Sequence, residues 1–107
     1  MTNQTMLAPD IPLDAIAAFC RRWDIREFAL FGSVLRADFN DESDIDVLVQ
    51  FREGVRYTLF DLARMGDELE AIFNREVDLL DRRAVEQSPN YIRRDSILQS
   101  AEVIYAD

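Results

Sequence analysis

Three aspartates stand out because their spacing along the chain could bring their carboxylates together. Asp44 and Asp46 begin an apolar run, DIDVLVQF at residues 44–51, and Asp78 lies between apolar residues in EVDLLD at 76–81. Side chains two residues apart in a strand point to the same face, so Asp44 and Asp46 project together. Asp78 joins them if its own strand lies beside theirs. The pattern therefore predicts three neighbouring carboxylates on one sheet.

Such a cluster needs a cation. Carboxylates about 4 Å apart repel each other by roughly 4 kcal/mol per pair at an effective dielectric constant of 20. Oxygen-only ligands suit a hard divalent ion, Mg²⁺ or a substituting Mn²⁺. One or two such ions can polarise a nucleotide phosphate and lower the pKa of an attacking hydroxyl. We therefore expect Asp44, Asp46 and Asp78 to be catalytic metal ligands for phosphoryl or nucleotidyl transfer.

A phosphate-binding turn is expected just upstream, at Gly32 and Ser33. Glycine lets the backbone approach phosphate oxygens, the serine hydroxyl can donate a hydrogen bond, and the amides of a following helix start favour an anion. Arg36 lies one helical turn further on, where its guanidinium could bind phosphate. The alternative for Arg36 is a surface pair with Asp38, which would contribute little to stability.

Missing residue types exclude several kinds of chemistry. The sequence contains no histidine, and all its basic residues are arginine, so His-based nucleophilic schemes and a lysine-dependent phosphate loop are excluded. The single cysteine, Cys20, cannot form an internal disulfide and is interpreted as a core residue. With 21 acidic against 12 basic residues, the net charge of −9 disfavours direct binding to nucleic acid.

The composition predicts one domain over residues 11–107, preceded by a flexible tail over residues 1–10. The apolar runs are much shorter than the roughly 20 residues that a membrane span needs, so no membrane association is expected. The first ten residues lack the basic start and apolar stretch of a secretory signal. We therefore expect a cytoplasmic protein.

Hydrophobic periodicity predicts alternating helices and strands. Helices are expected at 12–23 and 57–73, with a further helix beginning at Ser88–Pro89. Strands are expected at 25–32, 44–51 and 76–81, and a last short element is expected at 103–105. Asn74 is expected to end the long helix in a left-handed conformation. This alternation predicts an α/β (α+β) fold, with a mixed sheet of three to four strands backed by helices on one face.

The segment from residue 28 to residue 81 resembles the DNA polymerase β superfamily of nucleotidyltransferases. The resemblance rests on Gly32–Ser33, ten intervening residues and then Asp-Ile-Asp at 44–46, followed by Glu-Val-Asp-Leu-Leu at 76–80. Weaker similarity to minimal nucleotidyltransferases extends over almost the whole chain. The chain departs from many relatives at Ala37 and Asn74, where glycine is common, and neither position is a carboxylate.

Minimal nucleotidyltransferases of this kind resemble the antitoxins of toxin–antitoxin pairs whose partner is a HEPN ribonuclease. The resemblance implies that the chain uses ATP and Mg²⁺ to transfer AMP to a hydroxyl of that toxin, expected to be a tyrosine, and forms a hetero-oligomer with it. Two alternatives remain open at this point. The chain could neutralise the toxin by binding alone, or it could modify a small molecule.

Two arginine pairs, Arg82–Arg83 and Arg93–Arg94, lie outside these motifs. We interpret them as exposed charges on helix faces that offset nearby acids. The alternative is a basic surface for a nucleotide or an acidic partner.

Overall fold

The computed structural model describes residues 11–32 and 44–107. The tail expected over residues 1–10 lies outside these ranges. The elements follow one another as α1 (Leu13–Arg22), β1 (Ile25–Phe31), β2 (Ile45–Phe51), α2 (Leu59–Phe73), β3 (Val77–Asp81), α3 (Arg82–Glu86), α4 (Tyr91–Ser100) and β4 (Glu102–Ala106). The described helices include none that is both long and apolar enough to cross a membrane.

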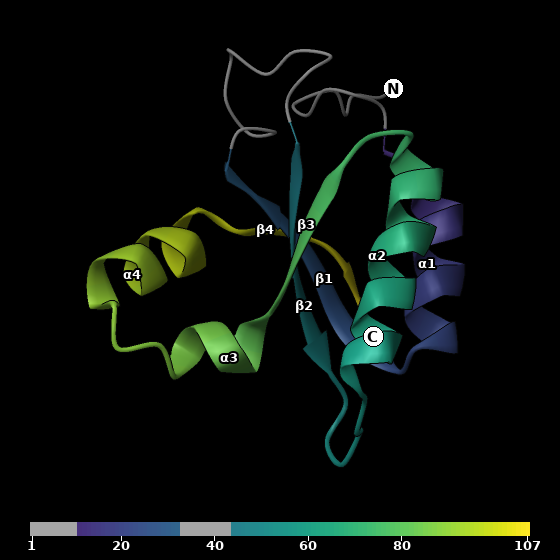
Figure 1. Ribbon diagram of the computed structural model, residues 1–107. Helices are drawn as coiled ribbons and strands as arrows, with labels where there is room; N and C mark the ends of the chain where they lie inside the picture. The colour runs from purple at the N-terminus through teal and green to yellow at the C-terminus, as the bar shows by residue number, and fades with distance from the viewer. Residues whose placement is uncertain (1–10, 33–43) are drawn as a thin grey trace.

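The strands form one mixed sheet in the order β3-β2-β1-β4 (Figure 1). The β1 strand pairs antiparallel with both β2 and β4, whereas β2 and β3 run parallel. A parallel pair needs a crossover connection, and α2 supplies it between these two strands. The parallel pairing places the first residues of β2 and β3 at the same end of the sheet.

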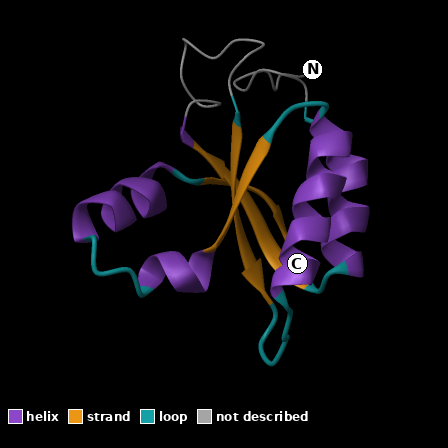
Figure 2. Ribbon diagram, viewed as in Figure 1, coloured by secondary structure: helices purple, strands orange, loops and turns teal. Residues whose placement is uncertain are grey.

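The sheet is covered by helices on both faces, as Figure 2 shows. The larger apolar cluster lies under α1 and α2, and it includes Phe19 and Leu69 from these helices together with Val47 from β2. A smaller cluster on the opposite face joins Leu48 of β2 to Val85 of α3 and Ile97 of α4. The β2 strand is therefore buried on both sides, which explains its nearly continuous apolar sequence.

The expected mixed sheet with helices is confirmed, with one addition. We expected helices on one face only, but α3 and α4 also pack on the second face, where Val85 and Ile97 are buried. The sequence pattern did not reveal α3, because five residues are too few to show helical periodicity. The second face is thus only partly open, and any site there has a helical wall.

Local signals at the helix ends are partly as expected. Asn74 ends α2 with φ 57°, the left-handed conformation predicted for it. The expected start of α4 at Ser88–Pro89 is wrong, because the helix begins after Asn90, whose side chain accepts a hydrogen bond from the backbone amide of Arg93. Ser88 instead accepts a hydrogen bond from the amide of Asn90 in the turn before the helix.

Glu68 joins the two helices of the larger cluster. Its Oε1 accepts hydrogen bonds from Arg22 Nη2 at 2.6 Å and from Trp23 Nε1 at 3.1 Å. Burial alone would raise the pKa of Glu68, but these two bonds and the charges of Arg22 and Arg64 lower it below the ordinary value. The charged form of Glu68 is therefore stabilised by folding.

We expect this contact to stabilise the protein at neutral pH and to fail on acidification. Because the folded-state pKa is lowered, the contribution is present above the ordinary pKa of 4.5 and is lost as the pH falls through the folded value. The contact is partly exposed, so Glu68→Gln should lower the free energy of unfolding by only about 1 kcal/mol or less at pH 7. Urea titrations at pH 7 and pH 3 measure this, with exposed Asp67→Asn as control. A Glu68→Gln deficit that is as large at pH 3 as at pH 7 would contradict this assignment.

Candidate active site

A row of side chains crosses three strands at one end of the sheet. Phe31 at the end of β1 pairs with Asp46 near the start of β2, and Asp46 pairs with Asp78 near the start of β3. Neighbouring strands lie about 4.8 Å apart, so these three residues are direct neighbours across the sheet. The pairing between β2 and β3, which the sequence only suggested, therefore places Asp46 beside Asp78.

Burial on either side of the two aspartates shows which face they share. Val47 is part of the larger cluster and Leu79 packs against it. Leu48 is part of the smaller cluster and Leu80 packs against that one. Since side chains alternate along a strand, Asp46 and Asp78 point to the face of the smaller cluster, on which α3 and α4 also pack. Asp46 is half-buried there, and Asp78 is exposed.

Asp44 lies one residue before β2 and is exposed. The strand alternation, continued one residue back across the fully buried Ile45, places Asp44 on the same side of the chain as Asp46. The strand register thus makes two of the three expected carboxylates, Asp46 and Asp78, direct neighbours. The third lies at the adjoining end of the same strand.

Gly32 fits closely against Asp46. Its φ is +76°, and a Cβ built on it would lie 2.2 Å from Asp46 Oδ2 and 3.1 Å from Asp46 Cγ. Any side chain at position 32 would therefore collide with the carboxylate, in a backbone conformation that already favours glycine. The expected role of Gly32 in phosphate binding is not tested by this contact. The contact shows instead that the glycine makes room for an acidic group of the predicted site.

Two other expected site residues, Ser33 and Arg36, lie outside the residues that the structure describes. Their assigned contacts to phosphate stay predictions.

The donor set is suited to a hard divalent cation, because only carboxylate oxygens are present. Within residues 11–32 and 44–107, no three acidic or cysteine side chains already converge tightly enough to hold a metal ion. The neighbouring pair Asp46 and Asp78 could provide two ligands, and Asp44 could provide a third if it turned toward them. Mg²⁺ commonly completes its coordination with water and substrate phosphates, so this small protein contribution fits it.

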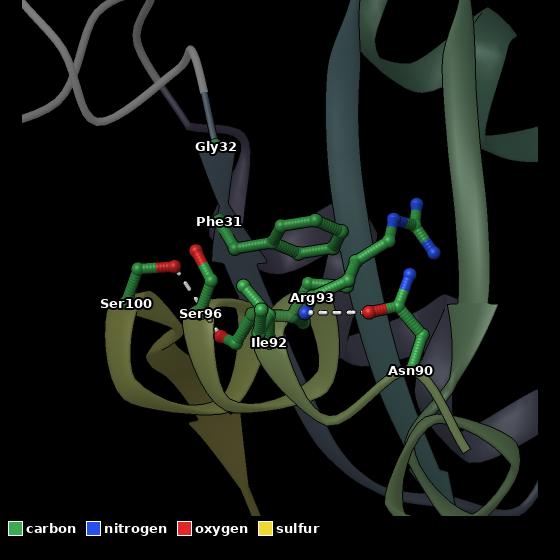
Figure 3. A pocket seen from close by; sticks show the side chains of 8 residues that line it. Phe31, Gly32, Asn90, Ile92, Arg93, Ser96 and Ser100 are labelled. Carbon is green, nitrogen blue, oxygen red and sulfur yellow. Dashed lines mark hydrogen bonds between the residues drawn. The ribbon is translucent and has the colours of Figure 1, made fainter. Parts of the chain in front are cut away.

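A pocket lies beside the row, between β1 and α4 (Figure 3). Its volume is about 780 Å³, within the roughly 300–1,000 Å³ that is usual for small-molecule sites. Phe31 forms part of its wall and is the register partner of Asp46, so the pocket is adjacent to the carboxylates. The lining residues are Phe31, Gly32, Asn90, Ile92, Arg93, Ser96, Ile97 and Ser100.

The residues that α4 contributes to the pocket were not predicted as site residues. Asn90 and Arg93 lie far along the chain from the Gly32 to Asp46 segment, and only the packing of α4 on the second face brings them near it. The Arg93–Arg94 pair was the one signal in the sequence. It was interpreted as exposed charge, with a basic surface for a nucleotide or an acidic partner as the alternative, and Arg93 is exposed at the edge of the pocket.

Two other titratable groups lie away from this row. Cys20 is fully buried in the larger cluster, and burial raises the pKa of its thiol to about 12. Tyr57 donates a hydrogen bond to Asp81, at the opposite end of β3 from Asp78. Burial, together with this bond, raises the pKa of the Tyr57 hydroxyl to about 12. Both groups are therefore uncharged at neutral pH, and the confirmed core position of Cys20 agrees with the prediction.

A comparison with known families gives a match over most of the chain. The family model described as "Nucleotidyltransferase domain" matches residues 14–103. The chain belongs to this family. The match spans every described element from α1 into β4, including both paired aspartates.

Similar proteins point to the minimal members of the family. MJ0435 of Methanocaldococcus jannaschii, a candidate protein adenylyltransferase by its name, is 36% identical over 77 residues, covering 72% of this chain and 76% of that protein. A solved structure described as a candidate minimal nucleotidyltransferase is 33% identical with a TM-score of 0.64, covering 84% of this chain and 86% of the other.

A third similarity concerns the fold alone. A solved structure of a tri-AMPylated Shewanella oneidensis HEPN toxin in complex with MNT antitoxin matches with a TM-score of 0.61 at 18% identity. The match covers 89% of this chain and 70% of the other.

Proposed function

We propose that this nucleotidyltransferase is an antitoxin that transfers AMP from ATP to a tyrosine hydroxyl of a HEPN ribonuclease toxin. The observation that carries the transferase part is the pairing of Asp46 with Asp78, with Gly32 packed against the Asp46 carboxylate. The protein acceptor is supported by the name of the Methanocaldococcus relative, and the toxin by the description of the Shewanella complex.

In this proposal the residues of the row hold the reacting groups. Asp46 and Asp78, with Asp44 beside them, would bind Mg²⁺, which when present offsets phosphate charge and lowers the pKa of the attacking hydroxyl. The hydroxyl oxygen forms a bond to the α-phosphorus, the bond to the β-phosphate oxygen breaks, and pyrophosphate leaves. We assign acceptance of the hydroxyl proton to Asp78, which is exposed and therefore open to the acceptor protein.

The test is intact-mass analysis of the protein encoded next to this chain's gene, after the two are produced together with ATP and Mg²⁺. We expect the partner to gain the mass of one or more AMP groups and to lose ribonuclease activity even when it is in excess. Neutralisation that needs one antitoxin per toxin and adds no mass would contradict the proposal. It would indicate inhibition by binding alone.

A further inference from the structure

Arg93 is placed differently from the arginine that follows it. It lines the pocket beside the carboxylate row, where Figure 3 shows its side chain among the lining residues. Arg94, the next residue, does not line the pocket, and its guanidinium donates to Asp95 Oδ1 at 3.2 Å and to the backbone oxygen of Ser88 at 3.4 Å. The two neighbouring arginines therefore differ in their surroundings: Arg93 borders the pocket, whereas Arg94 is bonded to Asp95 and Ser88 outside it.

The position of Arg93 on α4 is defined by the helix cap. Its backbone amide donates to Asn90 Oδ1 at 3.3 Å, which ties the first turn of α4 to another residue of the pocket wall. Ser96 lies three residues further along and lines the same pocket, as expected for residues on one helical face. Arg93 therefore belongs to a continuous face of α4 that borders the pocket.

Arg93 is the only charged residue among the eight described residues that line the pocket. The chain carries a net charge of −9, and the adjacent Asp46 and Asp78 are both acidic. A polyphosphate brought to this end of the sheet would be repelled by those groups unless positive charge were supplied. A guanidinium can supply it and can also bind two phosphate oxygens at once.

We propose that Arg93 binds the phosphates of the nucleotide from α4 and positions them against the carboxylate row. The pocket then holds the nucleotide between Phe31 on the sheet and the Asn90 to Ser96 face of the helix. The identity of the ligand rests on the proposed function, whereas the placement of Arg93 rests on the pocket alone. Arg93 is a binding residue in this account, and Arg94 has a structural role.

The experiment compares Arg93→Gln with the matched control Arg94→Gln. Calorimetry measures the equilibrium affinity for ATP with Mg²⁺, and thermal unfolding checks that both variants are folded. Losing a charge-assisted contact to phosphate should weaken ATP binding by about 10- to 100-fold in Arg93→Gln. Arg94→Gln should bind within about twofold of the unchanged protein, because that side chain does not reach the pocket. Arg93→Lys should fall between, since lysine keeps the charge without the bidentate geometry.

The outcomes separate this proposal from the proposed function. Wild-type ATP affinity in a folded Arg93→Gln variant, or an equal loss in Arg94→Gln, overturns the role of Arg93 even if AMP transfer occurs. An Arg93-dependent affinity for ATP without any modified partner supports the binding role and overturns the proposed transfer. Should Arg93→Gln fail to fold, Arg93→Lys decides the question. If Arg93→Lys binds ATP with unchanged affinity and has an unchanged KM for ATP, the result counts against bidentate phosphate binding by Arg93.

Discussion

Asp46→Asn is expected to reduce AMP transfer by about 10³-fold or more while leaving the protein folded. Metal coordination contributes several kcal/mol to such a reaction, and each 1.36 kcal/mol corresponds to a tenfold change in rate. Asp46 is the central member of the row, with Asp78 on one side and Phe31 on the other, so its loss removes the carboxylate that lies directly beside Asp78. Asparagine has nearly the same shape, and the strand is held by the buried residues Val47 and Leu48. The rate is measured as incorporation of labelled AMP into the partner.

The matched control is Asp67→Asn, an exposed aspartate on α2, which covers the opposite face of the sheet. It makes the same charge change without touching the row and should retain full transfer. Circular dichroism and thermal unfolding of both variants exclude a loss of fold. Full activity in Asp46→Asn would remove this residue from the active site.

Gly32→Ala is expected to reduce transfer about 100-fold or more through a steric contact. Gly54→Ala is the control that separates the effect of this contact from the effect of backbone strain. Both glycines have a positive φ, +76° and +81°, so alanine should cost roughly 1–2 kcal/mol of stability at either position. Only at Gly32 would the added Cβ meet another group, Asp46 Oδ2 at 2.2 Å, whereas at Gly54 it meets nothing within 4 Å. We therefore expect the two changes to destabilise the protein by similar amounts. Only Gly32→Ala should also displace the Asp46 carboxylate.

Urea titration gives the stability of each glycine variant, and labelled AMP incorporation gives its activity. Transfer should fall about 100-fold or more in Gly32→Ala, a loss comparable to that of a misplaced catalytic group. Gly54→Ala should transfer AMP normally at temperatures where it is folded. Normal transfer by a folded Gly32→Ala variant would show that the close packing of Gly32 against Asp46 is not required.

The carboxylate row was largely predictable because it depends on a local pattern. The alternation in DIDVLV places Asp46 opposite to Val47 on the strand. The structure confirms that alternation, because Ile45, Val47 and Val49 belong to the larger cluster and Leu48 to the smaller one. Asp78 was inferred from a similar pattern in a second apolar segment. What the sequence left open was whether the two strands are adjacent, and the register of β2 with β3 resolves this point.

The wall of the pocket could not be predicted in the same way. Its residues on α4 meet the row only through long-range packing, in which Ile97 joins the small cluster on the second face of the sheet. The helix also exposes apolar residues near its start, Tyr91 and Ile92, so its apolar pattern does not indicate which side faces the sheet. Both Ser88 and Asn90 are residue types that can cap a helix, so the sequence did not show where α4 begins. The register of the helix, and therefore which arginine faces the pocket, was also left open.

We propose that carboxylates from β2 and β3 act together on a metal-bound nucleotide. The most direct measurement is a crystal structure with Mn²⁺ and a non-hydrolysable ATP analogue, in which anomalous scattering locates the ion. We predict a Mn²⁺ peak bound by carboxylate oxygens of both Asp46 and Asp78 and in contact with the phosphates of the analogue. A nucleotide bound elsewhere, or an ion that contacts neither aspartate, would contradict the account.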